Sequence, residues 1–222
     1  MEIIAHIRTD FPEKFGIPRQ SSVLEKLTAR VEFTEAYSNP DFIRGIEGFS
    51  HLWLIWDFSE VPKEKTPSPT VRPPRLGGNK RLGVFATRSP FRPNPIGLSS
   101  VRLIRVENLK NGAKSLVVSG ADLVDGTPIY DIKPYLAYTD SHPDAAGGFT
   151  EEKWRELSVV FPEALLKKIP EEKREGLIAA LSADPRPPYQ NDPGRVYKMA
   201  FAGKTVSFRV EEQNLIVTEV KE

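Results

Sequence analysis

The chain has 222 residues, a formal net charge of +1 and no cysteine. This length can bury one good-sized hydrophobic core, or a main core and a smaller second one, so disorder is not expected. The lack of cysteine excludes disulfide bonds, thiolate metal sites and a cysteine nucleophile.

The N-terminus has none of the features of a secretory signal. Glu2 follows Met1 directly, and the next residues alternate between apolar and polar instead of forming a basic segment followed by an apolar one. The longest apolar run, 52–56, is far too short to span a bilayer. We therefore expect a soluble, cytoplasmic protein with no membrane partner.

The first half of the chain is expected to form strands. Apolar and polar residues alternate at 3–7 and 30–33, whereas 51–58 is a dense apolar run that predicts a strand buried on both faces. Because no helix of usual length separates these segments, an antiparallel barrel or sandwich fits better than a parallel sheet. The other predicted strands are 82–87, 99–106 and 115–119.

The composition changes at 142–148, where proline and glycine precede an acidic, helical stretch. We predict a β-barrel-like domain at 1–145 and a small α+β domain at 146–222, which makes the fold class mainly β. Pro162 and Pro170 are placed to start two helices, the second ending near residue 183. Alternation predicts strands after them, at 196–201, 205–210 and 215–220.

Charge is unevenly distributed along the chain. No acidic residue occurs between Glu64 and Glu107, and prolines in the same interval indicate rigid loops outside the central strands. Arginines in stiff loops suit phosphate or base recognition, and Phe85 or Phe91 could stack on a base; the alternative is a solvated basic loop. The basic residues of the interval are Lys65, Arg72, Arg75, Lys80, Arg81, Arg88, Arg92, Arg102 and Arg105.

A second candidate segment, 122–135, combines acids with tyrosines. Asp125-Gly126 is a turn signal and Thr127-Pro128 favours an extended exit, so a simple hairpin connection is one interpretation. The density of polar groups favours another, in which a carboxylate holds a ribose hydroxyl or a cationic amine. The residues concerned are Asp122, Asp125, Tyr130, Asp131, Lys133 and Tyr135.

The sequence indicates neither a metal site nor a Rossmann cofactor site. The histidines are scattered, and we interpret His6 and His51 as structural residues of strands. The Gly-x-Gly loop after a first strand and the acid after a second one are both missing. A nucleotide-like cofactor would have to be held in another way.

Several motifs, taken together and in order, resemble those of the TsaA-like family, whose bacterial members, called TrmO, are tRNA methyltransferases. The resemblance covers about residues 1–140, and 184–189 resembles the family's C-terminal signature. The motifs are Gly16-Ile-Pro-Arg-Gln20, Phe49-Ser-His-Leu-Trp53, Val71-Arg-Pro-Pro-Arg-Leu-Gly-Gly-Asn79, Gly83-Val-Phe-Ala-Thr-Arg-Ser-Pro-Phe-Arg-Pro-Asn-Pro-Ile-Gly97 and Asp122-Leu-Val-Asp-Gly-Thr-Pro128.

The resemblance implies a β-barrel enzyme that binds S-adenosylmethionine near a homodimer interface. It would methylate the N(6) amine of threonylcarbamoyl-adenosine at position 37 of tRNA. The implied cofactor contacts are Pro18, Arg19, Gln20, His51, Leu52, Arg88, Leu98, Asp125, Gly126, Thr127 and Pro128. The expected RNA contacts are Arg72, Arg75, Arg92, Arg186 and Tyr189.

Methyl transfer to an amine is a single in-line displacement, so positioning and electrostatics can supply most of the acceleration. An exocyclic amine is a poor nucleophile because its lone pair conjugates with the ring, so a hydrogen-bond acceptor would help. Asp125 and Asp131 are the candidate acceptors. Two rival hypotheses stay open: a non-enzymatic tRNA- or S-adenosylmethionine-binding barrel, and a structural interaction module whose prolines only stiffen loops.

Overall fold

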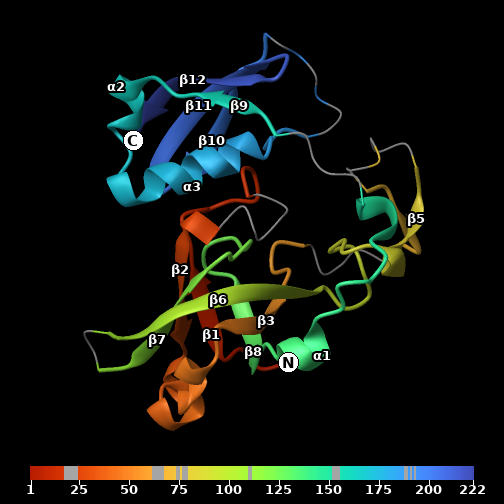
Figure 1. Ribbon diagram of the computed structural model, residues 1–222, viewed down its shortest axis with the longest axis vertical. Coiled ribbons are helices and arrows are strands. Elements are labelled where there is room, and N and C mark those ends of the chain that lie inside the picture. Colours follow the sequence, from red (N-terminus) through yellow and green to blue (C-terminus); the bar gives the residue numbers. More distant parts are fainter. Residues whose placement is uncertain are drawn as a thin grey trace.

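The structure, a computed structural model, describes residues 1–17, 25–61, 68–73, 76, 80–109, 112–151, 156–187, 190, 192 and 194–222. Figure 1 shows a β-barrel made by the first half of the chain and, above it, a sheet with helices made by the last third. The loops around β4 (Thr70–Val71) and β5 (Leu82–Gly83) extend to one side of the barrel.

Antiparallel strands close into a barrel within the described residues, in the order β1-β2-β7-β6-β3-β8. The mainly β, antiparallel fold class predicted from the sequence is confirmed. The interior is filled by alternate side chains such as Val31, Leu54 and Leu116, as expected for a small barrel. The barrel strands are β1 (Ala5–Arg8), β2 (Thr28–Phe33), β3 (His51–Asp57), β6 (Ile96–Asn108), β7 (Lys114–Ser119) and β8 (Pro128–Pro134).

The prediction that β3 is buried on both faces is wrong. Leu52 and Leu54 point into the core, whereas Trp53 and Ile55 are half-buried on the outer face and His51 is exposed. A barrel strand has one interior and one exterior face, so its apolar outer side chains need cover from elsewhere in the molecule.

Two other segments differ from the sequence-based expectation. The strand predicted at 82–87 is the short β5 followed by the 3-10 turn η6 (Val84–Ala86), because the Thr87 hydroxyl donates to the Val84 carbonyl (2.9 Å) and closes a turn. No strand was predicted at β8, whose segment was interpreted either as a hairpin connection or as a polar binding segment; it carries two prolines and two charges. Its backbone is nevertheless paired with both β1 and β3.

The C-terminal sheet has the order β10-β11-β12-β9, with β9 parallel to β12. The strands and the two helices predicted for this part are confirmed, and each helix begins directly after Pro162 or Pro170. The elements are β9 (Ser158–Val160), α2 (Glu163–Leu166), α3 (Glu171–Ser182), β10 (Tyr197–Phe201), β11 (Lys204–Glu211) and β12 (Asn214–Lys221).

Short helices connect the strands, and none in the described part of the chain is long and apolar enough to cross a membrane. Besides η6 they are η2 (Glu35–Tyr37), η3 (Pro40–Ile43), η4 (Ile46–Gly48), α1 (Ala137–Asp140) and η7 (Gly148–Thr150).

The C-terminal core recruits residues from the first thirty positions. Phe11 and Leu27 are buried in the same hydrophobic cluster as Leu177 and Phe208. Helix α3 lies between the C-terminal sheet and the barrel (Figure 1), and its Gly176 meets Leu27 so closely that an added Cβ would lie 2.2 Å from that side chain. The two parts of the molecule are therefore joined by apolar packing.

Candidate functional site

The turn before β8 is held to the start of the chain by backbone hydrogen bonds. Gly126 has a φ of 77°, which a side-chain-bearing residue rarely adopts, and its N–H donates to the Ile7 carbonyl (2.8 Å). The buried Thr127 hydroxyl donates to the Val124 carbonyl (2.7 Å). The turn from Asp125 to Pro128, which we call the Asp-Gly turn, is therefore rigid.

Asp125 is anchored at one oxygen. Its Oδ1 accepts the Thr9 N–H (2.9 Å), while Oδ2 lies 3.9 Å from the Arg8 guanidinium. The side chain is exposed enough for Oδ2 to face solvent or a ligand. Asp125 can therefore keep its place in the turn and still accept a further hydrogen bond.

A hydrogen-bond chain leads from Trp56 in the barrel core to Asp122. The Trp56 Nε1–H donates to Ser99 Oγ (3.0 Å), and the Ser99 hydroxyl donates to Asp122 Oδ1 (2.6 Å). Burial, the largest influence, raises the pKa of Asp122, while the Ser99 hydrogen bond and the positive charge of Arg88 act in the opposite direction. The charge of the exposed Arg88 side chain therefore acts on the Asp122 carboxylate, although these two described residues form no ion pair.

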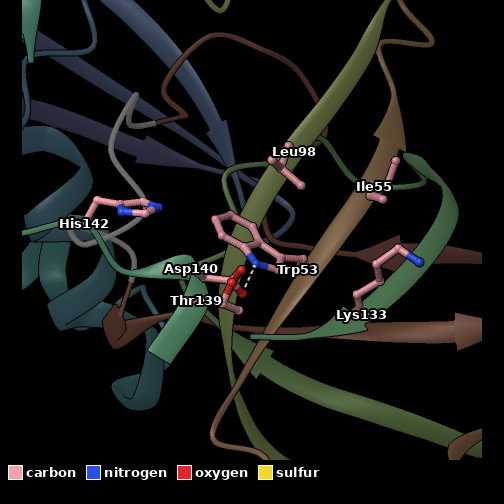
Figure 2. A pocket seen from close by; sticks show the side chains of 7 residues that line it. All are labelled: Trp53, Ile55, Leu98, Lys133, Thr139, Asp140 and His142. Atoms are coloured by element: carbon pink, nitrogen blue, oxygen red, sulfur yellow. Dashed lines mark hydrogen bonds between the residues drawn. The ribbon is translucent and has the colours of Figure 1, made fainter. Parts of the chain in front are cut away.

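The outer face of β3 carries a pocket of about 350 Å³, a volume in the range of small-molecule sites. Trp53 and Ile55 form its floor, and Leu98, directly opposite Ile55 on β6, forms one wall (Figure 2). Leu98 is 51% exposed, which is high for a leucine on a strand. The remaining lining residues are Lys133, Thr139, Asp140 and His142.

Helix α1 closes the pocket through one carboxylate. Asp140 Oδ2 accepts the Trp53 Nε1–H (2.8 Å; Figure 2) and the Leu136 N–H (2.9 Å). The backbone hydrogen bond from Leu136, followed by that from Trp53, lowers the pKa of Asp140. Tyr135 then lies beside both the Trp53 ring (5.4 Å between centroids) and the His51 ring (6.2 Å).

Asp131 has its own partners. Its Oδ2 forms an ion pair with Lys133 (2.8 Å), and Oδ1 accepts the N–H of Ile132 (2.9 Å). A register shift between Ile55 and Trp56 falls opposite Tyr130, so Asp131 faces outward beside Ile55. Burial, then a hydrogen bond to Asp57, raises the pKa of Tyr130 at this irregularity.

The predicted cofactor residues fall into two groups. The Asp-Gly turn lies at the level of Trp56, which pairs with Ile129, whereas His51 stands at the opposite end of β3. With a rise of about 3.3 Å per residue, the two ends are roughly 20 Å apart. Leu98, which pairs with Ile55, lies between these two ends. The Leu52 side chain is buried in the barrel core, so only the backbone of Leu52 could contact a ligand. Pro18, Arg19 and Gln20 lie outside the described residues.

The basic loops expose aromatic and cationic groups together. Phe85 is 77% exposed although its neighbour Val84 is buried, and Phe91 is also exposed. Arg72 and Arg88 are exposed, whereas Arg92 is half-buried with its guanidinium donating to the Thr87 carbonyl (3.1 Å). Arg75 lies outside the described residues.

Arg186 differs from the other predicted RNA contacts. Its side chain is only 10% exposed, and its Nε and Nη2 both donate to Asp184 (2.8 Å each). Asp184 itself has a φ of 51°. Arg186 therefore stiffens this loop, while Tyr189 lies outside the described residues.

Both parts of the chain are similar to proteins of one known family. Residues 6–141 match the family model of the tRNA-methyltransferase O N-terminal domain, and residues 155–222 match that of the TrmO C-terminal domain. The chain belongs to the TrmO family. A relative from Escherichia coli, named tRNA (adenine(37)-N6)-methyltransferase, is 40% identical over 95% of this chain and 93% of its own length.

Further similarities to the TrmO family extend over the whole chain. A Pseudomonas aeruginosa relative, whose name marks it as a candidate S-adenosylmethionine-dependent methyltransferase, is 38% identical over 96% of this chain and 93% of its own. A solved structure titled as TrmO superposes with a TM-score of 0.80 at 31% identity, covering 99% of this chain and 97% of that one. Fold and family are thus supported independently.

Three residues of the site were not named as candidates from the sequence: Trp53, Ser99 and Asp140. Trp53 shares the outer face of β3 with His51, and the two-residue spacing could have revealed it. Asp140 and Ser99 carry no such signal, because their partners are distant in sequence. Within the described residues, no group of three His, Asp or Glu side chains could hold a metal ion.

Proposed function

We propose that this protein transfers a methyl group from S-adenosylmethionine to the N(6) amine of adenosine 37 in tRNA, with threonylcarbamoyl-adenosine as the acceptor. The observation that carries this proposal is the likeness over 95% of the chain to the Escherichia coli relative named tRNA (adenine(37)-N6)-methyltransferase. The match to both family domains and the basic, aromatic loops are consistent with it.

The described residues fit a cofactor of this kind. The pocket on β3 offers an apolar floor and wall, formed by Trp53 and Leu98, with polar groups at its rim. Such a mixture is typical of nucleoside sites, where apolar contacts supply affinity and a few polar groups fix the orientation. Arg88 and the Asp-Gly turn add a cation and fixed backbone groups, and Pro18, Arg19 and Gln20 complete the proposed contact set.

The acting form, in this proposal, is a homodimer. A single small ligand cannot contact His51 and the Asp-Gly turn of one chain when the two are roughly 20 Å apart along β3. A second copy related by twofold symmetry could bring its own His51 end to the first copy's turn. The second copy would then also bury Leu98 and the outer face of β3, which are exposed or half-buried in a single chain.

Mixing inactive variants tests the shared site. His51→Ala and Arg88→Ala, each defective alone, should regain roughly a quarter of the parental activity when refolded together, because half of the dimers are mixed and each mixed dimer has one intact site. The control mixes His51→Ala with Tyr135→Ala, whose rings lie side by side in one chain, and should stay inactive. Recovery in neither mixture would contradict a site formed by two chains.

Once bound, S-adenosylmethionine supplies an electrophilic methyl on sulfonium, which moves to the amine nitrogen while the sulfur keeps the bonding electron pair. The chain's own contribution is to hold the amine in line and accept its proton. We propose Asp125 over Asp131 for this role. Asp125 keeps Oδ2 available within the rigid turn, whereas Asp131 is already paired with Lys133.

The RNA contacts are proposed for the loops on one side of the barrel. Arg72 and Arg92 can bind phosphates, together with Arg75, while exposed rings of the same loops meet bases. Arg186 would act by fixing residues 184–187 through Asp184, and Tyr189 is kept as a proposed contact from the sequence alone. We further propose a cytoplasmic location, where tRNA is modified, and the domain division at residue 145, which falls between the two family matches.

Transfer of the methyl group to tRNA distinguishes an enzyme from a module that only binds. The protein is incubated with S-adenosylmethionine labelled in its methyl group and with tRNA carrying or lacking the threonylcarbamoyl group. Label should appear only in the modified tRNA and fall strongly with Asp125→Asn. Binding of both ligands without transfer would support a non-enzymatic module instead.

A further inference from the structure

The segment Thr9-Asp10-Phe11, which we call the strap, leaves β1 and runs along the Asp-Gly turn. The Asp125 N–H donates to the Phe11 carbonyl (2.8 Å), and the Thr9 N–H donates to Asp125 Oδ1 (2.9 Å). The Thr9 hydroxyl adds a bond to the Leu123 carbonyl (3.1 Å). The turn therefore depends on the strap for its backbone and side-chain geometry.

The same strap is bound on its other side by the C-terminal domain. The Phe11 ring is 2% exposed and meets the Phe201 ring edge-on, with centroids 5.3 Å apart. The Asp10 carbonyl accepts the Ala202 N–H (2.8 Å), and the Asp10 carboxylate forms an ion pair with Lys173 on α3. Side chain and backbone of the strap are both fixed by residues that lie at least 160 positions away in sequence.

The C-terminal hairpin is shaped for this contact. Ala202 has a φ of 51° and Gly203 one of 74°, so the chain reverses tightly between β10 and β11. The reversal presents the Ala202 N–H to Asp10. A left-handed alanine costs about 1 kcal/mol or more, and such a conformation is kept only where the surrounding contacts hold it.

We infer that the C-terminal domain positions the cofactor-binding turn of the barrel through the strap. This inference rests on the proposed function, because it takes the Asp-Gly turn to be part of the S-adenosylmethionine site. The C-terminal domain then has a role beyond RNA contact: it sets the affinity for the cofactor. Thr9, Asp10, Phe11 and Lys173 are positioning residues, since they act through Asp125 and Gly126 and not on the ligand.

Lys173→Met tests the inference in the full-length protein. Methionine keeps the aliphatic contacts of the lysine stem and removes the charge that binds Asp10. The Kd for S-adenosylmethionine, measured by titration calorimetry, should rise about three- to tenfold, as expected for a partly buried ion pair. Lys173→Arg should restore most of the affinity. The matched control, Lys167→Met, removes an ion pair with Glu163 on α2 away from the strap and should leave the Kd unchanged.

A second readout separates positioning from general loss of stability. Amide hydrogen exchange at Asp125 and Gly126 should accelerate in Lys173→Met but not in Lys167→Met, with exchange in the core of β7 unaltered. Phe11→Leu, which keeps the apolar contact but loses the ring pair with Phe201, should give the same pattern. If the parent binds S-adenosylmethionine and Lys173→Met and Phe11→Leu both bind it equally well, the inference is overturned. A parent that fails to bind overturns the proposed function as well.

Discussion

The substitution Gly97→Ala, which adds a single methyl group, tests the packing of Trp56 against β6. It lies on β6 directly opposite Trp56, and the Trp56 ring covers its Cα. A Cβ at residue 97 would lie 2.1 Å from Trp56 Cε2 and 2.3 Å from Cζ2, well inside the contact distance of carbon atoms. The glycine therefore marks a close approach that alanine would block.

The expected cost of Gly97→Ala follows from two effects. Displacing the buried Trp56 ring is an overpacking change worth about 1–3 kcal/mol. Breaking the hydrogen bond from Trp56 Nε1 to Ser99 adds about 0.5–1.5 kcal/mol. The lower chain entropy of the unfolded alanine variant returns about 0.4–1 kcal/mol. We expect the free energy of unfolding to fall by roughly 0.5–4 kcal/mol in total.

Urea denaturation followed by tryptophan fluorescence and far-ultraviolet circular dichroism measures this change. Gly83→Ala is the matched control, because Gly83 has a φ of −56° and nothing within 4 Å of the added Cβ. It should be neutral or slightly stabilising. A Gly97→Ala variant as stable as the parent would refute the close approach of Trp56 to Gly97 and the expected loss of the hydrogen bond from Trp56 to Ser99.

Three further predictions concern binding and pH. Phe85→Ala should raise the KM for tRNA roughly tenfold without changing the Kd for S-adenosylmethionine, since base stacking on an exposed ring is worth about 1–3 kcal/mol; Phe42→Ala, at an exposed phenylalanine outside the basic loops, should have no effect. Arg88→Ala should weaken cofactor binding about tenfold and Arg186→Ala should weaken tRNA binding more, as calorimetry and filter binding would show; the opposite pattern would overturn the division of roles. Because burial raises the pKa of Asp122, the folded state holds its proton more tightly, so stability falls as pH rises above about 4. Asp122→Asn should therefore gain stability relative to the parent as pH increases from 4 to 8 in urea titrations, and a difference independent of pH would contradict this.

The sequence predicted those elements whose own residues carry the pattern. Strand β11 alternates between apolar and polar residues from Thr205 on, β10 and β12 do so in part, and α3 follows a proline that starts it, so local chemistry and tertiary packing agree there. Strand β8 escaped prediction because its polar residues and prolines argue for loop. It is made a strand by backbone pairing with β1 and β3, which only the closed barrel provides.

The candidate site was predictable to a similar degree. The Asp-Gly turn and Arg88 follow from turn chemistry, charge and family motifs. The closure of the β3 pocket by α1 could not be predicted, because Trp53 and Asp140 are 87 residues apart in sequence and meet only in the folded structure. The same holds for Asp10 and Lys173, separated by 163 residues, whose pairing links the two domains.

Nucleoside analysis of the reacted tRNA tests the central claim most directly. tRNA carrying threonylcarbamoyl-adenosine is incubated with the protein and S-adenosylmethionine, digested to nucleosides and examined by mass spectrometry. We expect the nucleoside at position 37 to gain one methyl group on N(6), and tRNA without the threonylcarbamoyl group to stay unmethylated. An unchanged nucleoside at position 37, or methylation at another position, would contradict the proposed reaction.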